Sequence, residues 1–334
     1  MTEIVLTGLG EVAVRDNETP EPGPNQVVVR TEATGVGFAE VQMRLGRYPA
    51  QPKFPFVPGY DVVGEIVATG TGTSWRVGQR VAAMTRTGSW SGHVVLRDRD
   101  LVAVPDGVDA AEAVALVTNG VTARQLLRDA NVRTGRTVLV HGIGGGVGAL
   151  LGQLAVLDGT RVIGTASARR HPDLAGLGAE LIDHRTEDVA AKVAELAPGG
   201  VDAVFDPLGP SSLPASWRLL APGGTLISYG SSATLDDSGP WFAPYLGIVR
   251  QLAGWEIRRL LGRTGGRRAR MYYVRSDARF RHDLSALFAL LADGRLRPLI
   301  AERLPLEDAE RALDLHLSGK RTGRIVLLPG SHRE

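Results

Sequence analysis

The chain has 334 residues, about twice a typical domain length, so two domains are expected and one small domain is excluded. Hydrophobic residues make up 43% of the sequence and charged residues 22%, which excludes a disordered or fibrous protein. Cysteine is absent, which excludes disulfides and thiolate-bound zinc, and a net charge of +2 gives no reason to expect a nucleic-acid partner.

The N-terminal segment 1–16 contains acidic residues and lacks the apolar core of a secretory signal peptide. We therefore expect a cytoplasmic protein. The longest apolar candidate, 241–261, is interrupted by proline, glycine and arginine, so we expect no membrane-spanning helix and no membrane partner.

Residues 1–116 are rich in glycine and proline and carry short β-type runs at close spacing. This pattern predicts a compact, β-barrel-like domain. The expected strands are 27–29, 62–67, 80–83, 94–96 and 101–104.

From about residue 117, strands alternate with helices, which predicts an α/β domain with a doubly wound parallel sheet. The expected strands are 137–141, 161–165, 180–182, 201–205, 225–229 and 271–274. The expected helices are 147–157, one near 174, 189–196, 213–220, 242–261 and 278–291. A final strand, 324–328, joins the first domain, so we expect one domain of 1–116 and 294–334 and an inserted domain of 117–293.

A glycine-rich turn, HGIGGGVG at 141–148, follows the first strand of the inserted domain and leads into an apolar helix. Without Cβ atoms in the way, backbone N–H groups can approach a pyrophosphate at the positive end of the helix. The alternative is a tight turn with no ligand. The residues expected at the phosphate are Gly142, Gly145, Gly146, Val147 and Gly148.

The end of the second strand indicates which dinucleotide binds. NAD sites present an acidic residue there, whereas NADP sites present small polar residues and a cation. No acid occurs between 159 and 171, but Ser167, Arg169 and Arg170 do. The sequence therefore favours NADPH, the alternative being that the two arginines form a solvated helix start.

Several motifs in a fixed order resemble one known family. They are RLGRYP at 44–49, PFVPGYDVVGEIVATG at 55–70, VLVHGIGGGVG at 138–148, VDAVFDPLG at 201–209, LLAPGGTLISYG at 219–230 and GKRTGRIVLL at 319–328. Over essentially its whole length the chain resembles the zinc-independent quinone oxidoreductase branch of the medium-chain dehydrogenase/reductase superfamily, including its vesicle-amine-transport-like and enoyl-reductase members. The resemblance implies a GroES-like barrel domain formed by both chain ends, an inserted Rossmann domain, NADPH in the cleft and usually a homodimer.

The chain departs from its zinc-dependent relatives at both metal-ligand positions. Where those relatives have a cysteine and a histidine, this chain reads GVGFAE at 35–40 and GYD at 59–61, so no metal is expected. Many zinc-independent relatives carry Asn-Phe-x-Asp where this chain has GFAE at 37–40. The amide often found beside the nicotinamide is therefore missing.

The resemblance implies further cofactor contacts, each with a structural alternative. Asn119 and Thr122 match a segment that approaches the nicotinamide ribose, and they would otherwise cap a helix. Arg324 matches a cationic position near the pyrophosphate, or is a surface arginine, and His184 matches a tyrosine position near the adenosine phosphate. Four residues end strands at the carboxyl edge, where open α/β sheets bind ligands, unless they form ordinary turns: Leu208, Gly209, Gly230 and Ser231.

Tyr48, in the RLGRYP motif, is the expected catalytic hydroxyl. Hydride addition to a conjugated C=C leaves an enolate that must be stabilised at oxygen and protonated at carbon. Tyr60 stands in the position of the zinc-binding histidine and lines the pocket or takes the same role. The alternative for both is a buried tyrosine bonded to a backbone carbonyl.

We therefore expect NADPH-dependent hydride transfer to a quinone or an activated C=C without zinc. The runner-up is a biosynthetic enoyl reductase whose arginines between 258 and 275 dock coenzyme A or an acyl carrier, unless these arginines form a solvated face. A non-catalytic NADPH-binding protein is the alternative from another class. The Tyr-xxx-Lys pair of short-chain reductases and the Gly-x-Ser-x-Gly elbow of hydrolases are both absent from the sequence.

Overall fold

A computed structural model describes residues 1–235 and 239–330, which form two compact units. Unit 1 comprises Met1–Val121 and Arg275–Glu334, and unit 2 comprises Thr122–Val274. The sequence predicted domain boundaries after residues 116 and 293, whereas the units divide after residues 121 and 274. The second boundary differs more, because α9 (Ala278–Ala292) lies in unit 1. In unit 1, α9 packs closely against the segment that contains Gly120, where an added Cβ would come 3.2 Å from Cδ1 of Leu287 in α9.

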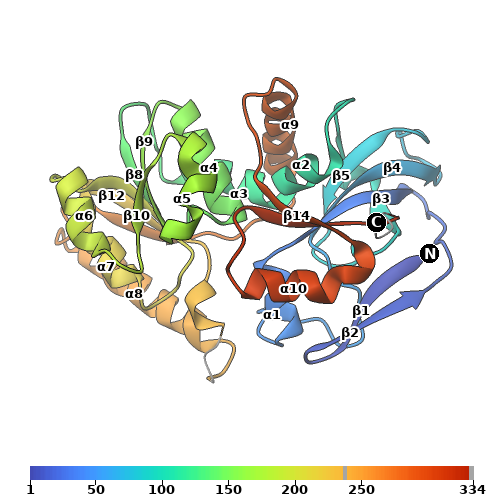
Figure 1. The fold of residues 1–334 in the computed structure, drawn as a ribbon, viewed down its shortest axis with the longest axis horizontal. Helices are drawn as coiled ribbons and strands as arrows, with labels where there is room; N and C mark the ends of the chain where they lie inside the picture. The colour runs from blue at the N-terminus through green and yellow to red at the C-terminus, as the bar shows by residue number, and fades with distance from the viewer. Residues whose placement is uncertain (236–238, 331–334) are drawn as a thin grey trace. The chain divides into compact units, whose positions relative to one another are not determined.

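The core of unit 2 is a six-stranded sheet in which every pair of neighbours is parallel (Figure 1). Its strand order, β10-β9-β8-β11-β12-β13, is the doubly wound order of the Rossmann fold. The alternation of strands and helices in the sequence predicted this sheet. The strands are β8 (Thr137–Val140), β9 (Arg161–Ala166), β10 (Glu180–Asp183), β11 (Val201–Asp206), β12 (Leu220–Ser228) and β13 (Arg268–Met271).

Helices cover both faces of this sheet (Figure 1). Side chains alternate between the faces along a strand, so Leu139, Ile163 and Val204 share one core with α6, α7 and α8. The helix α4 packs against β8 and β9 on the other side. The helices are α3 (Val121–Asp129), α4 (Gly146–Leu157), α5 (His171–Leu174), α6 (Val189–Leu196), α7 (Leu213–Arg218) and α8 (Ala243–Leu260).

Unit 1 contains a seven-stranded, mainly antiparallel sheet of order β14-β15-β3-β4-β5-β7, in which β6 also pairs with β3. The strand β3 is the centre of this sheet because it pairs with three others, and its valines Val27 and Val29 are fully buried. The elements are β3 (Gln26–Val36), α1 (Phe38–Arg44), β4 (Asp61–Thr69), β5 (Arg80–Met84), β6 (His93–Arg97), β7 (Val102–Ala103), α2 (Ala110–Ala115), β14 (Ile300–Pro305), α10 (Ala309–Leu317) and β15 (Arg324–Leu328).

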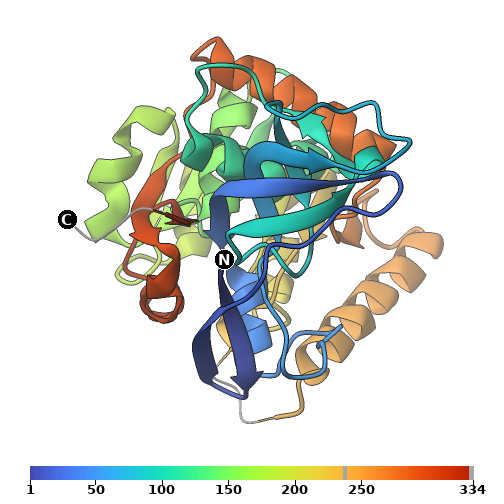
Figure 2. The same cartoon turned by 90° about the vertical axis from the view of Figure 1, so that its right-hand side faces the viewer.

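Three features of the structure differ from the sequence-based elements. A hairpin of β1 (Thr2–Gly8) and β2 (Glu11–Asp16), dark blue in Figure 2, and the short helices α1 and α2 were not predicted. The last strand of unit 2 is 268–271 and not 271–274. The apolar sequence of 271–274 was misleading, because β13 is an edge strand whose arginines face solvent while Ala269 packs against the core.

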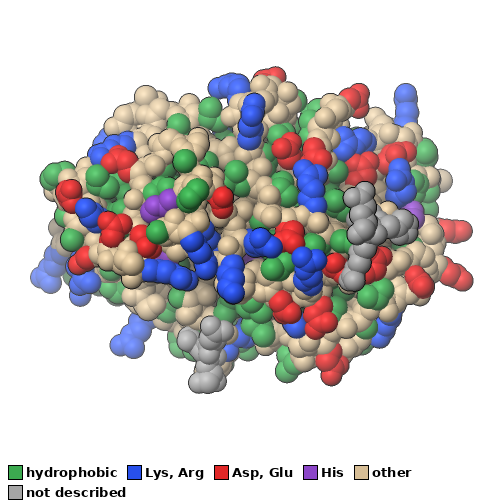
Figure 3. Space-filling model, viewed as in Figure 1, with side chains coloured by type: hydrophobic (Ala, Val, Ile, Leu, Met, Phe, Trp, Pro, Cys, Tyr) green, Lys and Arg blue, Asp and Glu red, His purple; other side chains and the backbone are tan. Residues whose placement is uncertain are grey.

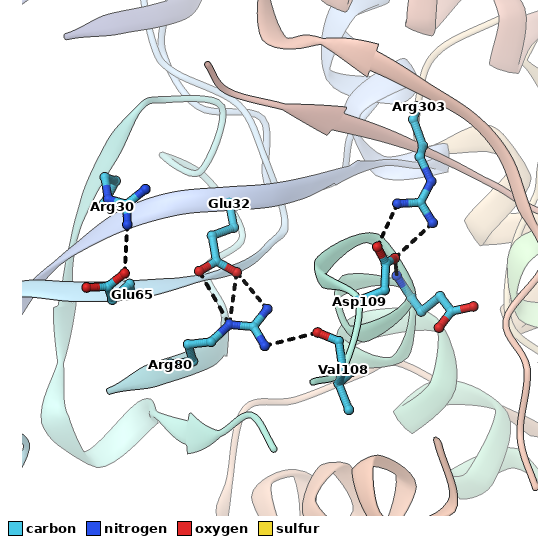
Figure 4. A network of polar contacts seen from close by, with 8 residues as sticks. Arg30, Glu32, Glu65, Arg80, Val108, Asp109 and Arg303 are labelled. Carbon is cyan, nitrogen blue, oxygen red and sulfur yellow. Dashed lines mark hydrogen bonds and ion pairs between the residues drawn. The ribbon is translucent and has the colours of Figure 1, made fainter. Parts of the chain in front are cut away.

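Partly exposed ion pairs connect the strands and helices of unit 1 (Figure 4). Arg30 on β3 pairs with Glu65 on β4 at 2.7 Å. Arg80 on β5 donates to both carboxylate oxygens of Glu32 on β3, the shortest distance being 2.7 Å. Arg303 donates to both oxygens of Asp109, which also caps α2.

The surface carries both signs of charge. On the face shown in Figure 3, basic and acidic side chains are interspersed, in keeping with 38 basic and 36 acidic residues in the sequence. Among the helices within 1–235 and 239–330, none combines the length and apolar character needed to cross a membrane.

Candidate functional site

At Gly148, the glycine turn of unit 2 has no room for a side chain. A Cβ at Gly148 would come 2.5 Å from the carbonyl oxygen of Gly142 and 2.8 Å from Cα of Ile143. Gly142 has φ of 64°, in the left-handed region that favours glycine. Gly145 caps α4, whose first residues are Gly146 and Val147. The start of α4 therefore presents its N–H groups without obstruction, as an anion site requires.

Hydrogen bonds hold this turn against the neighbouring strand β9. The Gly142 N–H donates to Oγ1 of Thr165 at 3.1 Å, and the Ile143 N–H donates to the Thr165 carbonyl at 3.1 Å. Because Thr165 comes from the strand that the sequence assigned to cofactor choice, the turn and the end of β9 form one structure.

Arg170 places a guanidinium beside the turn. A Cβ at Gly144 would lie 3.1 Å from Nη1 of Arg170, so the side chain lies directly against Gly144. The Arg170 N–H donates to the carbonyl of Ser167, which follows β9. Partial burial, followed by the positive charges of Arg169 and Arg185, lowers the pKa of Arg170. A concentration of positive charge at the end of β9 suits a phosphate group.

The turns that follow β11 and β12 pack on each other. A Cβ at Gly209 would come 3.3 Å from Cα of Ser231, and one at Gly230 would come 2.8 Å from the carbonyl oxygen of Pro207. The Leu208 N–H donates to Oδ1 of Asp206. The structure therefore brings together the four residues that the sequence placed at this sheet edge.

A buried polar network that the sequence did not predict underlies the glycine turn. Asp206 is fully buried and accepts hydrogen bonds from Ser212 and Ser216, and Nε2 of His141 lies 3.1 Å from Oγ of Ser216. Burial lowers the pKa of His141, although Asp206 opposes this shift. Because Ser216 bridges the carboxylate and the imidazole, the order is Asp–Ser–His and not the Ser–His–Asp order of a hydrolytic triad.

The remaining predicted contacts lie in different settings. Asn119 is buried in the π-helical turn of unit 1, and Thr122 is buried in the first turn of α3. His184 is exposed after β10. Arg324 is buried on β15, where Asp61 already neutralises its charge. Contacts of these residues with a cofactor stay predictions.

The two tyrosines predicted as catalytic form a hydrogen-bonded pair in unit 1. Tyr48 lies in the loop after α1 and Tyr60 directly precedes β4, and both rings are buried. Their hydroxyl oxygens are 2.8 Å apart and the rings meet edge to face at 78°. The two hydroxyls have two O–H protons between them, and the bond that joins them uses one. An O–H group that also accepts a hydrogen bond is polarised and becomes a stronger donor.

A buried ion pair follows directly after Tyr60. Asp61 is fully buried and accepts from Nη2 of Arg324 at 2.9 Å and from the Gly35 N–H at 3.0 Å. Nη1 of Arg324 donates to Oδ1 of Asn119 at 2.9 Å. These bonds connect the start of β4, the end of β3, the π-helical turn and β15, so they fix the base of the loop that carries Tyr60.

Glu40 lies beside this ion pair. Its Oε2 accepts from the Gly37 N–H at 2.9 Å, while Oε1 is buried without a hydrogen-bond partner. Burial raises the pKa of Glu40 from 4.5 to about 7, with Asp61 adding to the shift and Arg324 opposing it. The carboxyl group therefore changes charge near neutral pH.

Replacing Glu40 by glutamine should change how stability depends on pH. A raised folded-state pKa means that the folded state binds the proton more tightly, so the wild type loses stability as pH rises from about 4.5 to about 7. Glu40→Gln removes this loss. Thermal unfolding at pH 5 and pH 8 should show the variant gaining stability relative to wild type at pH 8. Parallel pH profiles would contradict the assignment.

The arginines between 258 and 275 come from several elements. Arg259 pairs with Glu256 at 2.6 Å. Arg268 and Arg270 lie on β13, whereas Arg275 belongs to unit 1. The hydrogen bond from Arg259 lowers the pKa of Glu256, and the charges of Arg268 and Arg270 add to this shift. Docking of an acyl carrier by these arginines stays a prediction.

No group of three or more His, Asp or Glu side chains with the arrangement of a metal site occurs in the described ranges. At the former zinc-ligand position, the hydroxyl of Tyr60 faces that of Tyr48. A phenol pair is a hydrogen-bonding group and not the donor set that zinc prefers.

Comparison with known proteins identifies the family. Residues 23–106 match the alcohol dehydrogenase GroES-like domain, and residues 177–327 match the zinc-binding dehydrogenase family. The chain is 36% identical over 322 residues to a quinone oxidoreductase of Pseudomonas aeruginosa, covering 94% of each protein. The chain belongs to the medium-chain dehydrogenase/reductase superfamily. Within it, the chain falls in the zinc-independent quinone oxidoreductase branch.

Other members of this superfamily are similar over the whole chain. The synaptic vesicle membrane protein VAT-1 homolog of Homo sapiens is 32% identical over 351 residues, covering 99% of this chain and 87% of that protein. A quinone oxidoreductase structure from Pseudomonas syringae has a TM-score of 0.84 at 32% identity and covers 98% and 99% of the two chains. A mycobacterial structure complexed with NADPH has a TM-score of 0.84 at 30% identity and covers 98% and 100%. The predicted fold, a GroES-like domain with a Rossmann domain, is confirmed.

Proposed function

We propose that the chain is an NADPH-dependent oxidoreductase that transfers hydride to a quinone or an activated C=C without zinc. The observation that carries the proposal is the glycine turn with Arg170 lying against it. A cradle that excludes side chains and has a cation at its edge fits a phosphorylated dinucleotide. The relatives named as quinone oxidoreductases and the NADPH complex of a mycobacterial relative agree with this proposal.

Each unit has its own part in the proposed reaction. In unit 2, the start of α4 binds the pyrophosphate, and Ser167, Arg169 and Arg170 bind the 2′-phosphate. Bound NADPH would supply the hydride. In unit 1, the hydroxyl pair of Tyr48 and Tyr60 donates a hydrogen bond to the oxygen of the acceptor, on which negative charge develops. Water supplies the proton at carbon.

Cofactor preference tests the first part. NADPH should bind at least about tenfold more tightly than NADH, because losing a charge-assisted phosphate contact costs about 1.5–3 kcal/mol. The double variant Arg169→Ala/Arg170→Ala should erase most of this preference. Arg161→Ala is the control, since it removes a positive charge at the other end of β9. Equal affinities of the wild type for both cofactors, measured by fluorescence titration, would refute this assignment.

We propose that the protein is a homodimer formed through unit 2. One side of α8, the orange helix at the right of Figure 2, packs on the sheet, but the opposite side is also apolar and is exposed. Leu246 is 62% exposed and Leu260 73%, and β13 leaves its outer edge unpaired within the described sheet. An exposed apolar stripe beside an open sheet edge fits a second copy of the chain.

Light scattering after size-exclusion chromatography tests the dimer. The wild type should have the mass of two chains, and Leu246→Glu/Leu260→Glu should have the mass of one, because both charges would be buried against the partner. Leu9→Glu changes a leucine that is 68% exposed on unit 1 and should remain dimeric. A monomeric wild type would exclude the proposed dimer.

The acceptor class and the cellular location belong to the same proposal. Enones and enoyl thioesters develop the same negative oxygen as quinones, so the tyrosine pair serves all three. We favour free quinones and enones over carrier-bound substrates, because similar proteins are named quinone oxidoreductases. We propose a cytoplasmic location, where NADPH is supplied.

A further inference from the structure

A second charged site lies in unit 2, away from the glycine turn. A groove of about 670 Å³ is lined by residues from the end of α3, the α3–β8 connection, β11, β12 and β13. Its volume lies within the range of small-molecule sites. The groove is lined by five arginines: Arg128, Arg133, Arg136, Arg268 and Arg270.

The groove lies at the opposite edge of the sheet from the proposed cofactor site. Arg136 directly precedes β8, Asp202 is near the start of β11, and Arg268 is the first residue of β13. The strands are parallel, so these positions share the amino edge, while the glycine turn follows the carboxyl end of β8. Four residues of β8, at ~3.3 Å each, separate the two sites by about 13 Å.

Arginines outnumber acids among the residues that line the groove. The acids among the lining residues are Asp129 and Asp202. Outside the lining, Glu256 on α8 has its pKa lowered by its bond to Arg259 and also by the charges of Arg268 and Arg270. Asp202 pairs with Arg136 at 2.8 Å and also accepts from the Thr137 N–H. Arg128 lies in the last turn of α3, where a cation complements the helix dipole, but the other four arginines lie outside helices. Helix ends therefore do not account for the cluster.

Strand pairing fixes two of these arginines in direction. Arg268 pairs in register with Thr225 and Arg270 with Ile227, so both arginine side chains point to the same side of the sheet. Ala269, between them, packs against the core shared with α8 on the other side. Both side chains therefore leave rigid β-structure on the side of Thr225, which also lines the groove.

We propose that this groove binds a soluble diphosphate group, such as that of a nucleoside diphosphate, at a site separate from the NADPH site. Guanidinium groups bind phosphate oxygens through paired, charge-assisted N–H donors. Five guanidinium groups offer more N–H donors than the oxygens of a single phosphate can accept, which favours a diphosphate. Charged and polar side chains dominate the lining, so a quinone or enone does not fit.

Calorimetric titration with inorganic pyrophosphate tests the proposal, using the full chain saturated with NADPH at low ionic strength. We expect one pyrophosphate per chain. Arg133→Gln/Arg268→Gln should weaken binding at least about tenfold, the loss expected for a charge-assisted contact. Arg258→Gln/Arg263→Gln removes equal charge from exposed positions of unit 2 outside the groove and should change affinity less than twofold.

Titrations with other phosphate compounds identify the ligand, and hydrogen exchange locates its site. ADP should bind as tightly as pyrophosphate or more tightly if a nucleoside diphosphate is the ligand, whereas AMP and orthophosphate should bind at least tenfold more weakly. Hydrogen exchange of 128–136 should slow when pyrophosphate is added, which provides a readout that needs no variant. Equal losses in the two double variants, no binding by the wild type, or displacement of NADPH by pyrophosphate would each overturn the proposal.

This site and the proposed oxidoreductase activity can fail independently. A chain that oxidises NADPH but binds no pyrophosphate lacks only the second site. A chain that binds pyrophosphate in the groove but oxidises no NADPH contradicts only the proposed function.

Discussion

Tyr48→Phe should slow hydride transfer by roughly ten- to a thousandfold while leaving NADPH affinity nearly unchanged. The substitution keeps the buried ring and removes only the hydroxyl that we propose stabilises the negative oxygen of the acceptor. Loss of one such donor typically has this effect in a site without a metal. Stopped-flow measurement with deuterated NADPH would show whether hydride transfer is the step that slows.

Two further variants separate the roles of the tyrosines. Tyr60→Phe breaks the 2.8 Å bond between the hydroxyls but leaves Tyr48 able to donate, so it should have a smaller effect. The double variant should be little slower than Tyr48→Phe, because the two hydroxyls act as one group. Tyr245→Phe, in α8, is the control for removing a hydroxyl elsewhere. Wild-type transfer rates in Tyr48→Phe would remove Tyr48 from the mechanism.

Arg324→Met should lower the free energy of unfolding of unit 1 by about 3–5 kcal/mol, the usual cost of removing one partner from a buried ion pair. Asp61 is fully buried, so its carboxylate would lose the cation that pairs with it and would keep its charge in a dry environment. Hydrogen exchange of β3 and β15 reports the stability of this unit by itself.

The surface pairs of the same unit provide the control for Arg324. Arg30→Met removes the solvent-exposed pair with Glu65 and should cost no more than about 1 kcal/mol (Figure 4). Asp61→Asn/Arg324→Met should recover part of the stability, since neither charge remains buried. Equal decreases in the free energy of unfolding for Arg324→Met and Arg30→Met would show that the buried pair contributes no more to stability than the exposed pair.

Local sequence patterns were sufficient to predict the sheet of unit 2. Each of its first five strands is an apolar run bounded by turn residues, and the glycines of 141–148 predicted a turn in which the structure leaves no space for a Cβ at Gly148. The edge strand β13 was misplaced because its arginines face solvent, so hydrophobicity gave no signal at 268–271. The hairpin of β1 and β2 was missed for a similar reason, since most of β2 is exposed.

The site required information that sequence order does not contain. Tyr48 and Tyr60 were each predicted from a motif, but only the fold shows that their hydroxyls meet. Asp61 and Arg324 are 263 positions apart, and no local pattern pairs them. The network of Asp206 had a weak signal: an aspartate that ends a buried apolar strand requires partners.

The arginine groove also depends on residues that are distant in the sequence. The sequence singled out the arginines between 258 and 275, whereas in the structure Arg268 and Arg270 line a groove with three arginines from α3 and the α3–β8 connection. Side-chain direction along a paired strand decides which cations share a surface, and density of charge in the sequence does not.

The central claim is that the chain transfers hydride from NADPH, and it is tested by following NADPH absorbance with the purified wild type. A benzoquinone, an α,β-unsaturated ketone and an enoyl thioester would be offered in turn. We predict oxidation of NADPH that depends on the acceptor, with the quinone or the enone as substrate and with much slower rates for Tyr48→Phe. Tight binding of NADPH without oxidation by any of the three acceptors would contradict the account and would leave a protein that binds the cofactor without catalysis.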